Sequence, residues 1–132
     1  MMISPRYHRE IPQRYRLEAG QCTGCGEIHF PPRAVCRKCA GREFSTLVLP
    51  KRGKVVTYTV CWIPPAEFDS QKPYVNAIVE LTNGVRLTCM VCEAPPDEVT
   101  VGTEVEMVFR KLQDDPVWEV IQYGYKARVV TA

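Results

Sequence analysis

The sequence is poor in histidine and lacks long apolar runs. Its 132 residues include only two histidines, His8 and His29. No apolar stretch approaches the roughly 20 residues that a membrane-spanning helix needs. The first residues, 1–6, lack the apolar segment of an export signal. These absences predict a cytoplasmic protein without a membrane segment.

Catalytic motifs are also missing. With two histidines, no Ser-His-Asp or Cys-His arrangement can be placed, and no Gly-rich phosphate loop occurs. Asp114 and Asp115, ahead of Pro116, are typical of a turn. We therefore expect no catalytic residues and a protein that is not an enzyme.

Cysteine is abundant, at seven residues. An odd number of cysteines in a chain without an export signal argues against a disulfide framework, because a reducing compartment keeps thiols free. Metal binding is the better interpretation.

Four of the cysteines follow the spacing of a zinc site. Two Cys-x-x-Cys pairs lie ten residues apart, formed by Cys22, Cys25, Cys36 and Cys39. Each pair is typical of a tight knuckle that presents two sulfurs, and two knuckles complete a tetrahedral shell. Four protein ligands leave no open position, so the expected zinc is structural. An iron-sulfur or rubredoxin-type iron site, a ligand role for His29, and four ordinary buried cysteines are the alternatives.

Glycines flank the cysteine pairs. Gly24 and Gly26 relieve steric crowding in the first knuckle. Gly41 has the same role after the second, although Ala40 holds the position that matches Gly26. A segment of about thirty residues buries too little apolar surface to fold alone, so metal binding supplies the missing free energy.

The other three cysteines do not form a second site. Cys89 and Cys92 share the Cys-x-x-Cys spacing, but they lie in a predicted strand, where residues three apart point to opposite faces. We interpret both, and Cys61, as packing residues.

Charge is unevenly distributed along the chain. Residues 1–54 hold eleven Lys or Arg and four Asp or Glu, whereas residues 55–132 hold six and eleven. The basic half contains an Arg-rich segment, 4–18, that Pro5 and Pro12 are expected to break into short pieces. We predict a short helix near residues 5–10 within an interaction arm; an ordinary solvated basic surface is the alternative.

From Gly53 onward the pattern indicates five β-strands. They are predicted at residues 55–63, 74–81, 85–91, 105–112 and 118–125. Val75, Ala77, Val79 and Leu81 face inward on the second strand; Val85, Leu87, Cys89 and Val91 do so on the third. Asn83-Gly84 between them favours a tight hairpin. The arrangement suits a small barrel of the OB type, with an SH3-like barrel as the competitor.

The whole chain is thus expected to be mostly β, with an N-terminal arm at 1–19, a rubredoxin-like zinc ribbon at 20–50 and a five-stranded OB-fold domain at 51–132.

Several segments together resemble a known family. They are Arg14-Tyr15-Arg16-Leu17, Cys22-x-x-Cys25-Gly26, Phe30-Pro31-Pro32-Arg33, Cys36-x-x-Cys39 and, later, Val101-Gly102-x-x-Val105. The chain resembles, over nearly its whole length, the zinc-ribbon plus OB-fold proteins associated with acyl-CoA enzymes, known as domain of unknown function thirty-five. Arg37 departs from that pattern, since many relatives have proline after the third cysteine.

The resemblance implies a function. The segment from Trp118 to Lys126 is similar to the archaeal branch, which joins acetoacetyl-CoA thiolase to 3-hydroxy-3-methylglutaryl-CoA (HMG-CoA) synthase in the mevalonate pathway. The chain would then be a non-catalytic scaffold that passes acetoacetyl-CoA between two enzymes. Other relatives accompany different thiolases, aldolases or hydratases. Arg33 and Arg37 are the candidates to meet the phosphates of coenzyme A.

Two other functions compete with this one. Zinc ribbons and OB barrels often bind nucleic acid, but single-strand binding needs aromatics on a basic groove, and the predicted barrel is acidic. A thiol-dependent transferase using Cys61, Cys89 or Cys92 would need a base to activate the thiol, and the sequence offers none.

Overall fold

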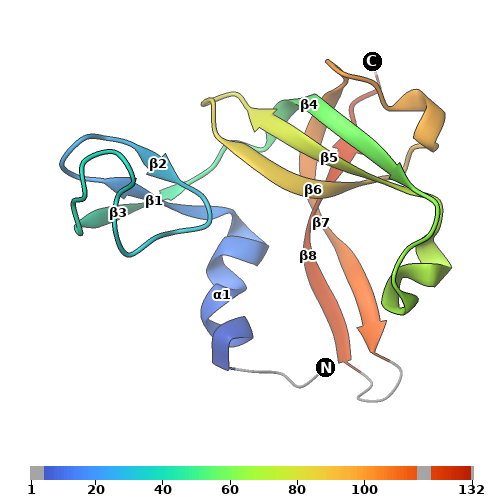
Figure 1. The fold of residues 1–132 in the computed structure, drawn as a ribbon, viewed down its shortest axis with the longest axis horizontal. Helices are drawn as coiled ribbons and strands as arrows, with labels where there is room; N and C mark the ends of the chain where they lie inside the picture. Colours follow the sequence, from blue (N-terminus) through green and yellow to red (C-terminus); the bar gives the residue numbers. More distant parts are fainter. Residues whose placement is uncertain (1–4, 116–119, 132) are drawn as a thin grey trace. The chain divides into compact units, whose positions relative to one another are not determined.

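The structure, a computed structural model, describes residues 5–115 and 120–131 (Figure 1). The chain divides into two compact units, with the boundary between Pro50 and Lys51. Among the described residues, no helix combines the length and the apolar character required to cross a membrane.

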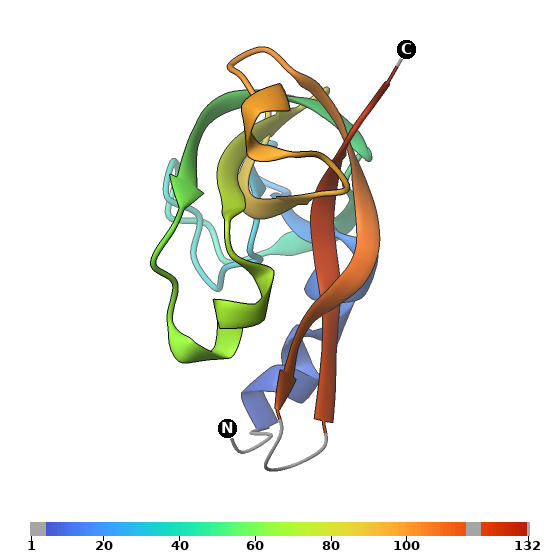
Figure 2. The ribbon, with the colours of Figure 1, turned by 90° about the vertical axis from the view of Figure 1, so that its right-hand side faces the viewer.

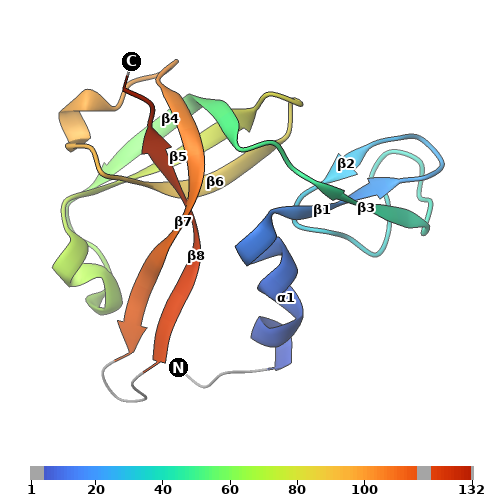
Figure 3. The ribbon, with the colours of Figure 1, turned by 180° about the vertical axis from the view of Figure 1, so that it is seen from behind.

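The first unit is one helix and a small sheet. Helix α1 spans Pro5–Arg16, and strands β1, β2 and β3 span Glu18–Cys22, Ile28–His29 and Phe44–Val48. The three strands are antiparallel in the order β2-β1-β3, with the short β1 at the centre (Figure 3). Leu17 turns the chain from helix to strand with a φ of 54°. Its carbonyl accepts a hydrogen bond from the N–H of Leu49, at 3.0 Å, and both side chains are buried.

Helix α1 corrects one prediction. A short helix is present, but Pro12 does not break it, and the helix continues to Arg16. Glu10 accepts from Arg6 at 2.7 Å and from Arg14 at 2.6 Å, so one i,i+4 ion pair precedes the proline and the other spans it. The guanidinium of Arg14 also lies 5.2 Å from the Tyr7 ring centroid. Such local pairs, each worth a few tenths of a kcal/mol, help to hold a helix that proline weakens.

The second unit is a closed five-stranded barrel. Its elements are β4 (Arg52–Cys61), the 3-10 helix η1 (Ala66–Gln71), β5 (Tyr74–Leu81), β6 (Arg86–Cys92), the 3-10 helix η2 (Pro96–Glu98), β7 (Glu104–Asp115) and β8 (Val120–Val129). The strand order is β4-β5-β6-β8-β7, and within residues 51–115 and 120–131 only the contact of β6 with β8 is parallel. This is the order of an OB fold, so the barrel is of the predicted type and not SH3-like.

Strands β5 and β6 show the predicted alternation. The inward residues of β5 are buried as expected, and Leu87, Cys89 and Val91 of β6 are buried as well. Val85 precedes β6 and is half-buried, because it lies in the hairpin turn. Gly84 has a φ of 83° and its N–H donates to the Leu81 carbonyl, which confirms the tight turn.

Gly53 is where the barrel closes. It pairs with Leu81 of β5 on one side and Val105 of β7 on the other. A Cβ atom at this position would lie 2.5 Å from the Glu80 carbonyl oxygen, and backbone cannot yield easily at such a distance. Only glycine therefore allows β4 to cross so close to β5.

Several strand boundaries differ from the predictions, most of them by one to three residues at the start of a strand, and those at the ends of β7 and β8 by three or four. β4 ends at Cys61, so Trp62 and Ile63 lie outside the strand. β7 continues through Asp114 and Asp115, where a turn was predicted, because those residues pair with β8. β8 likewise continues to Val129; Pro116, Trp118 and Glu119 lie outside the described residues. Beyond the barrel, β7 and β8 extend as a two-stranded ribbon (Figure 2).

Candidate metal centre

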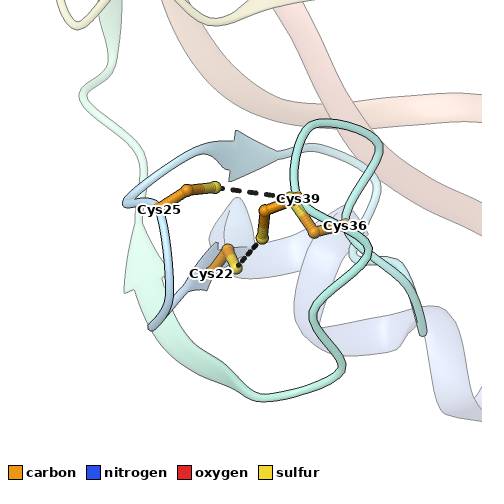
Figure 4. Close-up of side chains that lie close together, drawn as sticks. All are labelled: Cys22, Cys25, Cys36 and Cys39. Atoms are coloured by element: carbon orange, nitrogen blue, oxygen red, sulfur yellow. Dashed lines mark hydrogen bonds between the residues drawn. The ribbon is translucent and has the colours of Figure 1, made fainter.

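Each Cys-x-x-Cys pair sits in a tight backbone turn at one end of the small sheet (Figure 4). Cys22 is the last residue of β1, and its carbonyl accepts from the N–H of Gly26 at 2.9 Å. In the second turn the Cys36 carbonyl accepts from the N–H of Ala40 at 3.0 Å. The two turns thus repeat one hydrogen-bond pattern, and each directs its two sulfurs toward the other pair.

The four sulfurs form a compact set. The Sγ atoms of Cys22 and Cys39 lie 3.5 Å apart, as do those of Cys25 and Cys36. All four lie within 4.8 Å of one another. Zinc–sulfur bonds of about 2.3 Å in a tetrahedron place neighbouring sulfurs about 3.8 Å apart. The set therefore fits one tetrahedral metal ion and is consistent with one structural zinc per chain.

Backbone conformation explains the residues next to the cysteines. Gly26 has a φ of 75° and Ala40, at the matching position, a φ of 59°. Glycine adopts this region freely, whereas alanine does so at a cost. Gly41 has another role, since a Cβ there would lie 3.2 Å from the Cys39 sulfur and 3.4 Å from the Cys22 sulfur and would crowd both.

His29 supports the cysteines from beside them. It lies in β2, is buried, and its Nε2 is 3.3 Å from the Cys36 sulfur. Its ring meets the Phe44 ring edge-on, with centroids 5.9 Å apart. The compact set of four ligand atoms contains sulfurs alone. The sequence pointed to His29 only as an alternative ligand; a contact to a ligand sulfur depends on strand pairing that spacing does not reveal.

The thiols have unequal acidities. The pKa of Cys36 is lowered to about 5 because His29 hydrogen bonds to its sulfur, as do the backbone N–H groups of Cys39 and Lys38. The N–H of Glu27 lowers the pKa of Cys25, but burial and the adjacent Cys36 sulfur raise it by more, to about 12. Sulfurs this close cannot all be anionic without a cation between them. The fully ionised set therefore requires a metal.

The loop that carries the second pair is basic. Arg33, Arg37, Lys38 and Arg42 are all exposed, and residues 31–42 contain no acidic side chain. Lys38 forms an ion pair with Glu27 at 3.5 Å. The structure thus places the two arginines proposed from the sequence in solvent, on a loop anchored by Cys36 and Cys39.

The remaining cysteines lie in the barrel unit. Cys89 is buried, and its burial, followed by the proximity of Cys92, raises its pKa to about 12. Burial also raises the pKa of Cys92. Cys61 pairs with Tyr74 across β4 and β5, and its side chain raises the tyrosine pKa by hydrogen bonding. None of the three belongs to the compact set of sulfurs.

Comparisons with known proteins agree with both units. Residues 9–45 match the family model described as the rubredoxin-like zinc ribbon domain of ChsH2. Residues 48–110 match the model of the C-terminal OB-fold domain of ChsH2.

Whole-chain relatives extend this agreement. The chain is 41% identical to a "DUF35 domain-containing scaffold protein" of Methanocaldococcus jannaschii, over 95% of this chain and 89% of that protein. It is 27% identical to the "Benzoylsuccinyl-CoA thiolase subunit BbsA" of Thauera aromatica, over 75% and 67% of the two chains. A solved structure described as "Ltp2-ChsH2(DUF35) aldolase" is similar with a TM-score of 0.73 and 28% identity, covering 98% and 96%. The chain therefore belongs to the family of DUF35 domain-containing scaffold proteins, which unite a zinc ribbon with an OB fold.

Proposed function

We propose that this chain is a non-catalytic subunit that joins acetoacetyl-CoA thiolase to HMG-CoA synthase, so that acetoacetyl-CoA passes from one enzyme to the other. Cys22, Cys25, Cys36 and Cys39 ligate one structural zinc ion that fixes the shape of the first unit. The family membership supports the scaffold role. The relatives described as a thiolase subunit and as an aldolase with ChsH2 support a thiolase-type partner.

The observation that carries the proposal is the closed set of four sulfurs. All lie within 4.8 Å of one another, and four thiolates saturate a tetrahedral zinc ion. Such an ion has no free position for a substrate or a water molecule. Its contribution is to hold two loops, of which the second exposes Arg33, Arg37, Lys38 and Arg42. A metal used in this way suits a protein that binds other proteins.

Arg33 and Arg37 have a further role in this proposal. Both side chains are exposed. Arg33 lies between the two cysteine pairs, and Arg37 lies between Cys36 and Cys39 of the second pair. Arginine forms paired hydrogen bonds to phosphate oxygens, and coenzyme A carries three phosphates at one end. The two arginines would meet those phosphates where coenzyme A lies in a partner enzyme.

Co-purification tests the proposal. The chain is tagged in its native source and recovered at low salt, and the associated proteins are identified and quantified. We expect thiolase and synthase in stoichiometric amounts. Recovery of the chain alone would contradict the scaffold role, and recovery with a hydratase or a different thiolase would replace the named partners.

A variant of the metal site adds a second test. Cys25→Ser removes one of four ligands, and the expected result is loss of zinc together with loss of at least one partner. Cys89→Ser, in the barrel, is the matched control and should retain zinc. Full assembly by zinc-free Cys25→Ser would show that the metal-bound unit is not a docking element.

A further inference from the structure

The segment between β4 and β5 exposes two large apolar side chains in succession. Trp62 is 68% exposed and Ile63 is 94% exposed. Isolated apolar residues are common on protein surfaces, but adjacent ones of this size and exposure often mark a contact site. We refer to residues 62–72 as the tethered loop.

The tethered loop has internal order. Pro64 and Pro65 restrict the backbone directly after Ile63. The Pro65 carbonyl accepts from the N–H of Phe68 at 2.9 Å, which starts η1. The Phe68 ring then packs against Tyr74, the first residue of β5, with centroids 6.0 Å apart.

Gln71 fastens the end of the loop to the β7–β8 ribbon. Its Nε2 donates to the Leu112 carbonyl of β7 at 2.8 Å, and its Oε1 accepts from Lys126 Nζ of β8 at 3.0 Å. One side chain thus bridges the loop and both strands of the ribbon. Figure 2 shows η1, in green, beside the paired ends of β7 and β8.

Lys126 makes this bridge more than a surface contact. The residue is only 7% exposed, and a buried ammonium group needs an acceptor. Gln71 Oε1 supplies one. Nearby, Gly124 leaves space for the Leu112 side chain, since a Cβ on Gly124 would lie 2.7 Å from Leu112 Cδ1. Leu112 and Lys126 thus both hold the loop through Gln71.

A loop held in this way loses little freedom when its exposed residues bind, which favours affinity. Tryptophan is also among the residues most often found at the energetic centre of protein interfaces. The surrounding charge selects the partner. Glu67 and Asp69 are exposed on η1, and Lys72 is paired with Asp69 at 2.6 Å. The one basic side chain of the loop is thus neutralised and Glu67 leaves the loop slightly acidic, which disfavours nucleic acid, whose phosphates require a basic surface.

We propose that the tethered loop is the barrel's docking site for the thiolase, with Trp62 and Ile63 inserted in an apolar pocket of that enzyme whose rim is neutral or basic. Gln71 is a positioning residue that acts through the loop. This inference rests on the proposed function, because it assigns to the barrel one of the two enzyme contacts that a scaffold needs.

Binding of purified thiolase to the full zinc-loaded chain tests the inference. We expect W62A/I63S to bind at least about tenfold more weakly than the wild type, as for residues at an interface centre. Q71A keeps both apolar side chains but frees the loop, and its complex should dissociate faster. V101S is the control, since Val101 is 67% exposed on another loop of the barrel; its affinity should stay within about twofold of wild type.

The outcomes separate this inference from the proposed function. Wild-type affinity in W62A/I63S, with unchanged zinc content and thermal midpoint, would overturn the docking site alone. Binding of no enzyme by the wild type would overturn both. The free chain is also run by light scattering. A dimer that W62A/I63S abolishes would show that a second copy occupies the site, which would overturn the enzyme assignment.

Discussion

Ala40 occupies, in the second knuckle, the place that Gly26 occupies in the first. Both residues have positive φ, and both donate to the carbonyl of the first cysteine in their pair. A side chain in this left-handed region costs about 1 kcal/mol relative to glycine. The backbone of the second knuckle is thus more strained than that of the first, and the cause is the methyl side chain of Ala40.

This difference can be measured by exchanging the two residue types. Ala40→Gly should stabilise the zinc-bound first unit by up to about 1 kcal/mol, and Gly26→Ala should destabilise it by about the same amount. A Cβ on Gly26 has no other atom within 4 Å, so the expected loss is conformational. Both values follow from the chelator concentration that releases half of the zinc. Equal release by Gly26→Ala and the wild type would contradict the explanation.

A second residue-scale effect belongs to Gln71. The substitution Gln71→Ala removes an acceptor of the buried Lys126 amine and a donor to the Leu112 carbonyl. Leaving buried polar groups without partners costs about 1–3 kcal/mol. We expect the free energy of unfolding of the barrel to fall by that amount in a urea titration. Gln122→Ala, at a half-buried position on β8, should change it by less.

At the scale of elements, the two units depend on different forces. The barrel has a continuous apolar core that includes Val55, Val79 and Val105. The first unit buries few apolar side chains, and two of its buried residues are the cysteines Cys22 and Cys36. Its cohesion therefore depends on the metal, whereas that of the barrel depends on apolar burial.

Zinc removal should consequently unfold one unit and not the other. Chelation, or Cys25→Ser, is expected to abolish protection from hydrogen exchange in β1 and β3 while β5 and β6 remain protected. Amide exchange resolved by residue gives the measurement. Loss of protection in both units at the same chelator concentration would show that the barrel also needs the metal. Persistent protection of β1 without zinc would show that the first unit folds on its apolar contacts.

Elements also differ in how far the sequence predicts them. Local patterns were sufficient for β5, whose bounds Tyr74–Leu81 match the prediction, and for the turn at Gly84. Pro12 misled, because the helix continues through it to Arg16, and the ion pairs of Glu10 with Arg6 and Arg14 only help to hold it. The closure at Gly53 and the bridge from Gln71 join residues distant in sequence, and no periodicity encodes such contacts.

The metal site shows the same division. The spacing of the four cysteines predicted a set that the structure brings together. The support from His29 was missed, because it requires β2 to pair with β1 and so place the ring beside Cys36. A histidine seven positions before Cys36 carries no such information by itself.

At the scale of the whole molecule, the two units differ in charge. Residues 2–50 contain eight Lys or Arg and four Asp or Glu, and residues 51–132 contain nine and eleven. Four thiolates on one zinc add two negative charges to the first unit, so its net positive charge becomes small. The positive side chains nevertheless stay concentrated on the loop of Arg33 and Arg37. Attraction to this loop is therefore local, and salt should screen it over about 8–10 Å.

Charge reversal on that loop tests its contribution to assembly. Arg33→Glu with Arg37→Glu should weaken binding of one partner enzyme by about tenfold at low salt, and the difference should shrink as salt rises. Lys54→Glu with Arg86→Glu makes the same change of charge on the barrel and should affect that partner less.

Measuring both pairs of substitutions with and without coenzyme A separates two mechanisms. If the arginines bind the phosphates of coenzyme A, their reversal weakens the complex only when coenzyme A is present; if they bind acidic groups of the enzyme, the loss is the same in both conditions. No effect in either condition would remove this loop from the interface and leave the zinc-bound unit to act through its other exposed residues.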